Sequence, residues 1–193
     1  MVKFMRFEKG HKENTRRRII EVASKRFRRD GIAASGLAGI MAESGLTNGA
    51  FYPHFDSKET LVKEALSSAL NDQYLVLTND VSGATNIEDA IRRYLNRSHL
   101  SGCDEGCPSA ALLPEIGRQS ESTKKMYEEA YRSYIGGLAM LLPKPKSANS
   151  RRQAATIFGL MVGTMQIARA VSDPQLANEI LEDGVQAALK LSR

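Results

Sequence analysis

Apolar residues recur every three or four positions along almost the whole chain of 193 residues, and strand-like alternation is nearly absent. Glycines, prolines and short polar stretches divide this pattern into about nine segments. Because an amphipathic helix must cover its apolar stripe with other helices, the sequence predicts an all-α fold. The expected helices cover residues 15–30, 36–44, 48–54, 56–79, 86–99, 109–119, 122–142, 148–171 and 174–191, after a flexible arm over residues 1–13.

Positive charge is concentrated near the N-terminus. Residues 1–58 contain 12 Lys and Arg against 6 Asp and Glu, whereas residues 59–193 contain 15 against 16. A basic head on a nearly neutral body suggests a polyanionic partner for the head alone. A solubilising run of charge explains the same numbers equally well, so charge by itself does not decide between these interpretations.

Neither a membrane span nor a secretory signal is expected. The longest uncharged stretch lies between Arg152 and Arg169, has 16 residues and includes several polar ones. A membrane-spanning helix needs roughly 20 mostly apolar residues. Two cysteines in a chain of this length do not form a disulfide scaffold. We therefore expect a soluble, cytoplasmic protein.

Residues 31–61 have the dimensions of a helix-turn-helix, because two short predicted helices are joined by a tight turn at Gly45. The second helix of this motif enters the major groove of DNA with its N-terminal residues leading. In this chain it begins with Thr47, Asn48 and Gly49, which are small or polar. The spacing alone also fits an ordinary helical hairpin whose aromatic residues are packing residues.

The residues in this segment favour the DNA-binding interpretation. Residues 46–61 read Leu-Thr-Asn-Gly-Ala-Phe-Tyr-Pro-His-Phe-Asp-Ser-Lys-Glu-Thr-Leu and closely resemble the signature of the TetR family of bacterial regulators. Residues 106–113 and 166–174 resemble a subset of that family. The resemblance implies a nine-helix fold with a DNA-binding domain over residues 1–58 and an effector-binding and dimerisation domain over 59–193. It also implies repression of a nearby gene, relieved when a ligand enters the body.

The resemblance also implies particular DNA contacts. These residues are Ser35, which would touch a phosphate, and Thr47, Asn48, Gly49, Tyr52, His54 and Lys58. The chain departs from the family pattern at Asn48, where Lys or Arg is frequent, and this favours hydrogen bonding to adenine. Pro53 replaces a frequent tyrosine and removes a phosphate contact. Because Gly36, Ala38 and Gly39 offer no polar side chains, part of the affinity is expected to come from the first helix and from Lys3, Arg6, Lys9 and Lys12.

The predicted helix over residues 148–171 is apolar on two faces, so it needs two partners. One partner is the core of its own subunit, and the second is expected to be another copy of the chain. Gly159 and Gly163 would permit a close approach of helices. A central helix inside a single subunit is the alternative. A two-fold homodimer would require a roughly palindromic operator.

An effector pocket is expected between helices of the body. Its candidate residues are Tyr94, Arg97, Leu112, Met126, Tyr131, Met161 and Met165, although such residues more often fill a core. Cys107 precedes Pro108 at a predicted helix start, where backbone amides favour a thiolate. Cys107 is therefore a candidate sensor of electrophiles or oxidants, with Cys103 as a resolving partner. A small buried packing residue is the simpler interpretation of Cys107.

Little in the sequence favours an enzyme. The three histidines, His11, His54 and His99, are scattered, and no catalytic triad, phosphate loop or metal-ligand spacing is present. We expect no cofactor and no metal. A helical interaction module that does not bind DNA would explain the amphipathic helices, but it leaves the basic head and residues 46–61 unexplained. We therefore predict a ligand-responsive DNA-binding regulator, a repressor released from a palindromic operator by a small molecule.

Overall fold

The computed structural model describes residues 9–79 and 83–193, and within them it contains nine α-helices, one 3-10 turn and no strand. The all-α prediction is therefore confirmed. The elements are α1 (Lys9–Asp30), α2 (Leu37–Glu43), the 3-10 turn η1 (Asn48–Ala50), α3 (Lys58–Thr78), α4 (Ile87–Tyr94), α5 (Arg97–Ser101), α6 (Pro108–Ile116), α7 (Glu121–Met140), α8 (Ser150–Ala170) and α9 (Pro174–Leu191). Lys3 and Arg6 lie outside the described residues.

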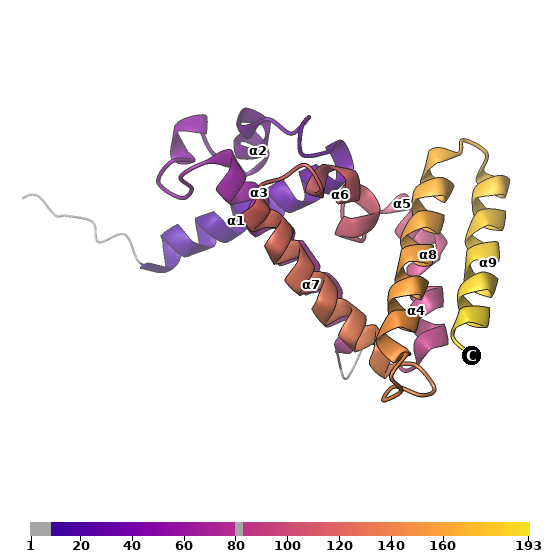
Figure 1. Ribbon diagram of the computed structural model, residues 1–193. Helices are drawn as coiled ribbons and strands as arrows, with labels where there is room; N and C mark the ends of the chain where they lie inside the picture. The colour runs from indigo at the N-terminus through magenta and orange to yellow at the C-terminus, as the bar shows by residue number, and fades with distance from the viewer. Residues whose placement is uncertain (1–8, 80–82) are drawn as a thin grey trace, which may run out of the picture.

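The molecule is elongated, with different groups of helices at its two ends (Figure 1). The head, which consists of α1, α2, η1 and the first half of α3, lies at one end. The antiparallel pair α8 and α9 lies at the other end. Helix α3 packs along α7, and α7 in turn packs against α8, so these long helices join the head to the body. The body consists of α4 to α9.

Two hydrophobic cores correspond to the head and the body. The head core contains Ile19, Ala23, Phe27, Ile32, Ile40, Met41, Phe51, Phe55, Leu61, Val62, Ala65, Leu66, Leu112 and Ile116. The body core is centred on α8 and includes Ile157, Phe158, Met161 and Met165. Because the start of α3 and two residues of α6 belong to the head core, packing in the head continues beyond residue 58.

Some boundaries differ from the predicted ones. Helix α1 begins at Lys9, six residues before the predicted start. The prediction missed these first turns because they are polar and extend beyond the core, so no apolar repeat marks them. The predicted helix over residues 86–99 is interrupted after Tyr94, and α5 begins anew where the Asn96 side chain accepts a hydrogen bond from His99 N at 2.8 Å. A helix-capping side chain therefore starts a new helix within three residues of the end of the previous one.

Candidate DNA interface and effector cavity

The turn between α2 and η1 places the reading segment, residues 47–54, on the surface of the head. Gly45 adopts φ +68°, a left-handed conformation that residues with a side chain rarely take. Leu46 N donates to Met41 O at 2.9 Å, which closes the turn. The buried hydroxyl of Ser44 donates to Ile40 O at 2.8 Å. The chain therefore reverses tightly between the two short elements.

The reading segment is not the regular helix that was predicted over residues 48–54. Phe51 N donates to Asn48 O at 3.2 Å in the 3-10 pattern, and an α-type bond follows only from Phe55 N to Phe51 O. Pro53 explains the interruption, because it has no N–H to donate to Gly49 O and its ring crowds that carbonyl. The sequence-based expectation for Pro53 was only a lost phosphate contact and did not include this effect on the backbone.

Two aromatic rings anchor the reading segment to the head core. Phe51 and Phe55 are buried, and their rings stack with centroids 5.4 Å apart. Tyr52, between them in sequence, is 70% exposed. Thr47, Asn48 and Gly49 are also exposed. We call the set Thr47, Asn48, Gly49 and Tyr52 the reading surface.

Arg16 of α1 also holds the reading segment in place. Its guanidinium lies 4.8 Å from the Phe55 ring centroid, donates to His54 O at 3.4 Å and forms an ion pair with Glu64. Burial lowers the pKa of His54, and the nearby cations Lys12 and Arg16 lower it further. The exposed Lys12 therefore lies close to the reading segment, near the start of α1.

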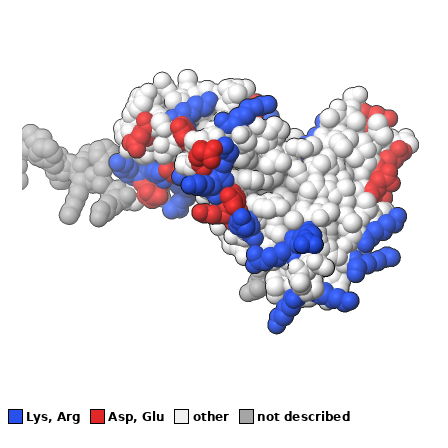
Figure 2. Space-filling model, in the orientation of Figure 1, with Lys and Arg blue, Asp and Glu red and all other residues white. Residues whose placement is uncertain are grey.

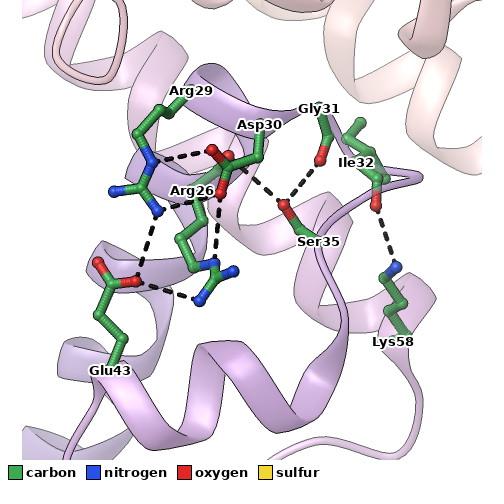
Figure 3. A network of polar contacts seen from close by, with 8 residues as sticks. All are labelled: Arg26, Arg29, Asp30, Gly31, Ile32, Ser35, Glu43 and Lys58. Atoms are coloured by element: carbon green, nitrogen blue, oxygen red, sulfur yellow. Dashed lines mark hydrogen bonds and ion pairs between the residues drawn. The ribbon is translucent and has the colours of Figure 1, made fainter.

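Two of the predicted DNA contacts are used inside the protein (Figure 3). Ser35 is 0% exposed, and its hydroxyl donates to Gly31 O at 2.7 Å. The turn before α2 encloses this hydroxyl, so the predicted phosphate contact of Ser35 stays a prediction that would require the side chain to leave its bond to Gly31 O. Lys58 is half-buried, and its ammonium donates to Ile32 O at 3.0 Å. It fixes the start of α3 against the same turn.

Ion pairs neutralise part of the positive charge of the head. Arg29 donates to both carboxylate oxygens of Asp30, at 2.9 and 3.0 Å, and these hydrogen bonds lower the pKa of Asp30. Arg26 forms a 3.2 Å ion pair with Glu43 of α2 (Figure 3). Gly39 leaves space for Arg26, since a Cβ there would lie 2.8 Å from a guanidinium nitrogen. Figure 2 accordingly shows acidic and basic side chains intermixed over the head.

A cavity of about 350 Å³ lies between the head and the body. It is lined by Arg28 of α1, by Ala69, Asp72, Gln73, Val76 and Leu77 of α3, by Ala84, Ala90, Arg93, Tyr94, His99, Glu105, Gly106 and Cys107, and by Tyr134 of α7. Of the seven predicted effector residues, only Tyr94 lines this cavity. Met161 and Met165 fill the body core, Leu112 lies in the head core, and Arg97 is exposed and bonded to Asn178. Tyr131 and Met126 are half-buried against the two cores.

Hydrogen bonds fix the polar wall of the cavity. His99 Nδ1 lies 2.7 Å from Tyr94 O, a carbonyl that can only accept, so this nitrogen carries the proton. His99 Nε2 then accepts from Cys107 N at 2.9 Å. Burial lowers the pKa of His99, which favours this neutral form. Cys107 is buried at the start of α6, and its Sγ accepts from Gln73 Nε2 at 3.0 Å.

Two residues of this wall were missed from the sequence. Nothing in the local pattern pointed to Gln73, and His99 was noticed only as an isolated histidine. A histidine shortly before a Cys-Pro helix start is the one signal that could have linked His99 to Cys107.

The wall of the cavity is tied directly to the head. Arg28 Nε donates to Asp104 O at 2.6 Å, and Lys25 forms a 2.9 Å ion pair with Glu105. Both cations belong to α1, and both partners lie in the loop that leads to Cys107. A change of that loop would therefore act on α1 without passing through another helix.

The outer face of α8 and α9 carries apolar groups without cover in this chain. Ile167 is 58% exposed and Leu176 is 42% exposed. A Cβ at Gly159 or Gly163 would meet nothing within 4 Å, whereas one at Gly184 would meet Thr164 of α8. The close helix approach within the chain therefore uses Gly184, and the two predicted glycines leave open space beside α8.

In residues 9–79 and 83–193, no helix combines the length and the apolar character that a bilayer crossing requires. The same part of the chain has no group of three or more His, Cys, Asp and Glu residues placed to hold a metal ion.

Comparison with known proteins agrees with this architecture. The family of bacterial regulatory proteins, tetR family, matches residues 19–65, from α1 into α3. The HTH-type transcriptional regulator LmrA of Bacillus subtilis (strain 168) is 26% identical over 155 residues, which cover 77% of this chain and 82% of LmrA. The HTH-type transcriptional regulator TtgR of Pseudomonas putida is 41% identical over 64 residues, 33% of this chain and 30% of TtgR.

A solved TetR-family regulator from Cytophaga hutchinsonii superimposes with a TM-score of 0.75 at 21% identity, covering 94% of this chain and 96% of that structure. Its likeness shows that the fold extends over the body as well as the head. Together with the match over α1 to α3, it confirms the resemblance seen in residues 46–61. Residues 19–65 therefore form a DNA-binding domain of the tetR family of bacterial regulatory proteins, and the chain as a whole has the fold of solved regulators of that family.

Proposed function

We propose that the protein is a cytoplasmic homodimeric repressor that binds a palindromic operator and leaves it when a small molecule occupies the cavity. The observation that carries the proposal is the reading surface. It presents the exposed Thr47, Asn48 and Tyr52 from a segment that the buried Phe51 and the adjoining Phe55 anchor in the head core. Such a surface can approach DNA without rearranging, because its backbone is already fixed by packing.

Each residue of the reading surface has a role suited to its chemistry. The Asn48 side chain can both donate to and accept from the edge of adenine in the major groove, which fits direct base readout. Gly49 has no side chain and lets the backbone approach the bases. Tyr52 presents its hydroxyl for a phosphate, and the nearby Lys12 adds a cation without an ion-pair partner among the described residues. His54, being neutral, would serve as an N–H donor.

The outer face of α8 and α9 supports the homodimer. The exposed Ile167 and Leu176, with the open space at Gly163, form an apolar surface that a second copy can cover. A two-fold dimer would present two reading surfaces, so half-sites about one helical turn or a multiple of it apart follow from symmetry.

The contacts of Arg28 support a route from effector to DNA. Arg28 lines the cavity and holds the carbonyl of Asp104, while its helix α1 carries Lys12 and Arg16 at the reading segment. A ligand in the cavity that shifts the loop would therefore bias the position of α1 and hence of the reading segment. Because the two heads of a dimer must fit both half-sites at once, a modest shift suffices for release.

The experiment selects the operator from a randomised duplex pool and then measures affinity by fluorescence anisotropy at several salt concentrations. We expect binding that weakens steeply with salt. Tyr52→Ala should weaken binding to all sequences, whereas Asn48→Ala should relax preference at one base pair per half-site, at a cost of about 1–3 kcal/mol. Ser133→Ala, a truncation of an exposed hydroxyl on α7, is the matched control and should bind as the parent does.

Two results would contradict the proposal. If Tyr52→Ala and Asn48→Ala both bind the selected operator like the parent, the reading surface is assigned to the wrong residues. If the parent shows no salt-dependent binding to any duplex, the helical interaction module becomes the better interpretation.

A further inference from the structure

The polar wall of the cavity contains a hydrogen-bond donor that the protein leaves unused. Tyr94 is only 7% exposed, and its hydroxyl has no hydrogen-bond partner among the described residues. Such a buried, unsatisfied hydroxyl costs stability, and a bound molecule with an acceptor oxygen would remove that cost. Because Tyr94 lines the cavity, this donor indicates a ligand that places an oxygen inside it.

The remainder of the cavity defines the other part of the ligand. Its walls away from the polar groups are formed by Ala69, Val76, Leu77, Ala84 and Ala90. The exposed Asp72 and Glu105 also line the cavity, so it reaches the surface of the molecule. A volume of about 350 Å³ accommodates a ligand of roughly ten to fifteen non-hydrogen atoms with room to spare. The site therefore suits a mainly apolar molecule with one acceptor oxygen.

A nucleophile lies beside the unused donor. Burial raises the pKa of Tyr94, and the neighbouring Cys107 in the same cavity raises it further, so the phenol remains protonated and able to donate. Gln73 Nε2 donates to Cys107 Sγ at 3.0 Å, and this contact holds the sulfur in the wall of the cavity. His99 is not free to act as a base, because both of its ring nitrogens are hydrogen-bonded.

We infer that the cavity captures an apolar α,β-unsaturated ketone, whose carbonyl oxygen accepts a hydrogen bond from the Tyr94 hydroxyl and whose β-carbon is attacked by Cys107 Sγ. This inference names the effector class of the proposed regulator and rests on that function. Tyr94 supplies the donor for the oxygen that becomes negative, and Cys107 supplies the nucleophile.

The reaction balances without any oxidant or reductant. The thiolate sulfur forms an S–C bond to the β-carbon, and the C=C π bond breaks. Its electrons move to the carbonyl oxygen, where an enolate is stabilised by the Tyr94 hydroxyl. The proton that left the thiol is regained from water at the α-carbon, which gives a saturated ketone attached to Cys107 through a thioether.

The experiment treats the full-length protein with 3-nonen-2-one and, in parallel, with 2-nonanone, which has the same length and carbonyl but no C=C bond. Intact mass and peptide mapping report the adduct and its position, and anisotropy reports release from the selected operator. We expect one adduct, on Cys107, together with release from DNA. The saturated ketone should give neither. Cys103→Ser should react like the parent, and Cys107→Ser should not react.

The role of Tyr94 is tested separately from that of the thiol. Tyr94→Phe should slow adduct formation with 3-nonen-2-one by about 10-fold, the value of one hydrogen bond. Its reaction with methyl methanethiosulfonate should be unchanged, because that reagent modifies the thiol without using a carbonyl donor. Circular dichroism melting checks that each variant is folded. If Cys107→Ser does not fold, the comparison of Tyr94→Phe with the parent still tests the inference.

Each remaining outcome has a definite meaning. If Cys107 does not react, or Tyr94→Phe slows both reagents equally, the inference is overturned while the regulator stands. If 2-nonanone releases DNA as well as the enone does, the effector binds without covalent capture and the inference is again overturned. If the parent binds no DNA but forms the adduct, the proposed function fails and the chemistry of the site survives.

Discussion

Two glycines in α8 and α9 have opposite surroundings. Substitutions at these two positions should therefore distinguish effects on the folding of one chain from effects on dimerisation. At Gly184 of α9, a Cβ would lie 2.8 Å from Thr164 Oγ1 and closer still to Thr164 Cγ2. At Gly163 of α8, one position before that threonine, a Cβ would meet nothing within 4 Å. Gly184 therefore permits α8 and α9 to touch, whereas Gly163 faces away from its own chain.

The expected magnitudes follow from these surroundings. Gly184→Ala forces Thr164, which is buried and β-branched, or the α9 backbone to move, which costs about 1–3 kcal/mol of unfolding free energy. The better helix propensity of alanine offsets about 1 kcal/mol of that loss. Gly163→Leu meets no clash in the single chain and should gain up to about 1 kcal/mol from helix propensity.

In a two-fold dimer of the Gly163→Leu variant, each subunit contributes one new leucine side chain to the interface. Overpacking of about 1–3 kcal/mol at each copy gives about 2–6 kcal/mol in total, which raises the dimer Kd by roughly 30-fold to 10⁴-fold. We therefore expect Gly163→Leu to be a folded monomer at micromolar concentration, where the parent is a dimer. Gly184→Ala should remain largely dimeric but melt at a lower temperature.

Sedimentation velocity over a range of concentrations measures the dimer Kd, and guanidinium unfolding of each variant measures stability. Stability is compared at one concentration, because dimerisation itself contributes to it. If Gly163→Leu dimerises as tightly as the parent, the outer face of α8 is not the interface. If Gly184→Ala unfolds like the parent, the packing of α9 on Thr164 has been misjudged.

Three further predictions follow from individual contacts. Ser35→Ala removes the 2.7 Å bond to Gly31 O and should lower the unfolding free energy by about 1–3 kcal/mol without changing the affinity of the folded protein for DNA; lost affinity with unchanged stability would reinstate a phosphate contact. Because burial lowers the pKa of His99, the unfolded state takes up its proton first, so stability should be full above pH 6.5 and fall as the pH drops below that value. Urea unfolding from pH 7 to 5 should show a shallower loss in His99→Gln, and equal slopes would refute this. Arg28→Ala breaks the bond to Asp104 O, so the variant should bind the operator like the parent yet resist release when the adduct forms. If anisotropy shows normal release, the contact between Arg28 and Asp104 does not transmit the effect of the ligand to the DNA-binding head.

Local sequence was sufficient to establish the helical class, most helix positions and the family. Asn86 caps α4, Pro108 occupies the first turn of α6, and α9 has the predicted bounds, 174–191. These features depend on residues within one or two turns of each other, so a local pattern is sufficient to find them. Residues 46–61 also carry a family signature that is contiguous in the chain. A contiguous motif needs no knowledge of how distant segments pack.

Packing between distant segments determined which residues share the cavity and which serve the core. Leu112 was predicted to contact an effector, but α6 presents it to the head core; Ser35 was predicted to contact DNA, but the turn before α2 encloses it. Conversely, Gln73 and Tyr94 meet Cys107 only because α3, α4 and the loop before α6 converge. A helical repeat shows that a face is apolar but does not show what covers it. That choice is made by contacts between residues far apart in the chain, so the cavity appears only when the helices are packed.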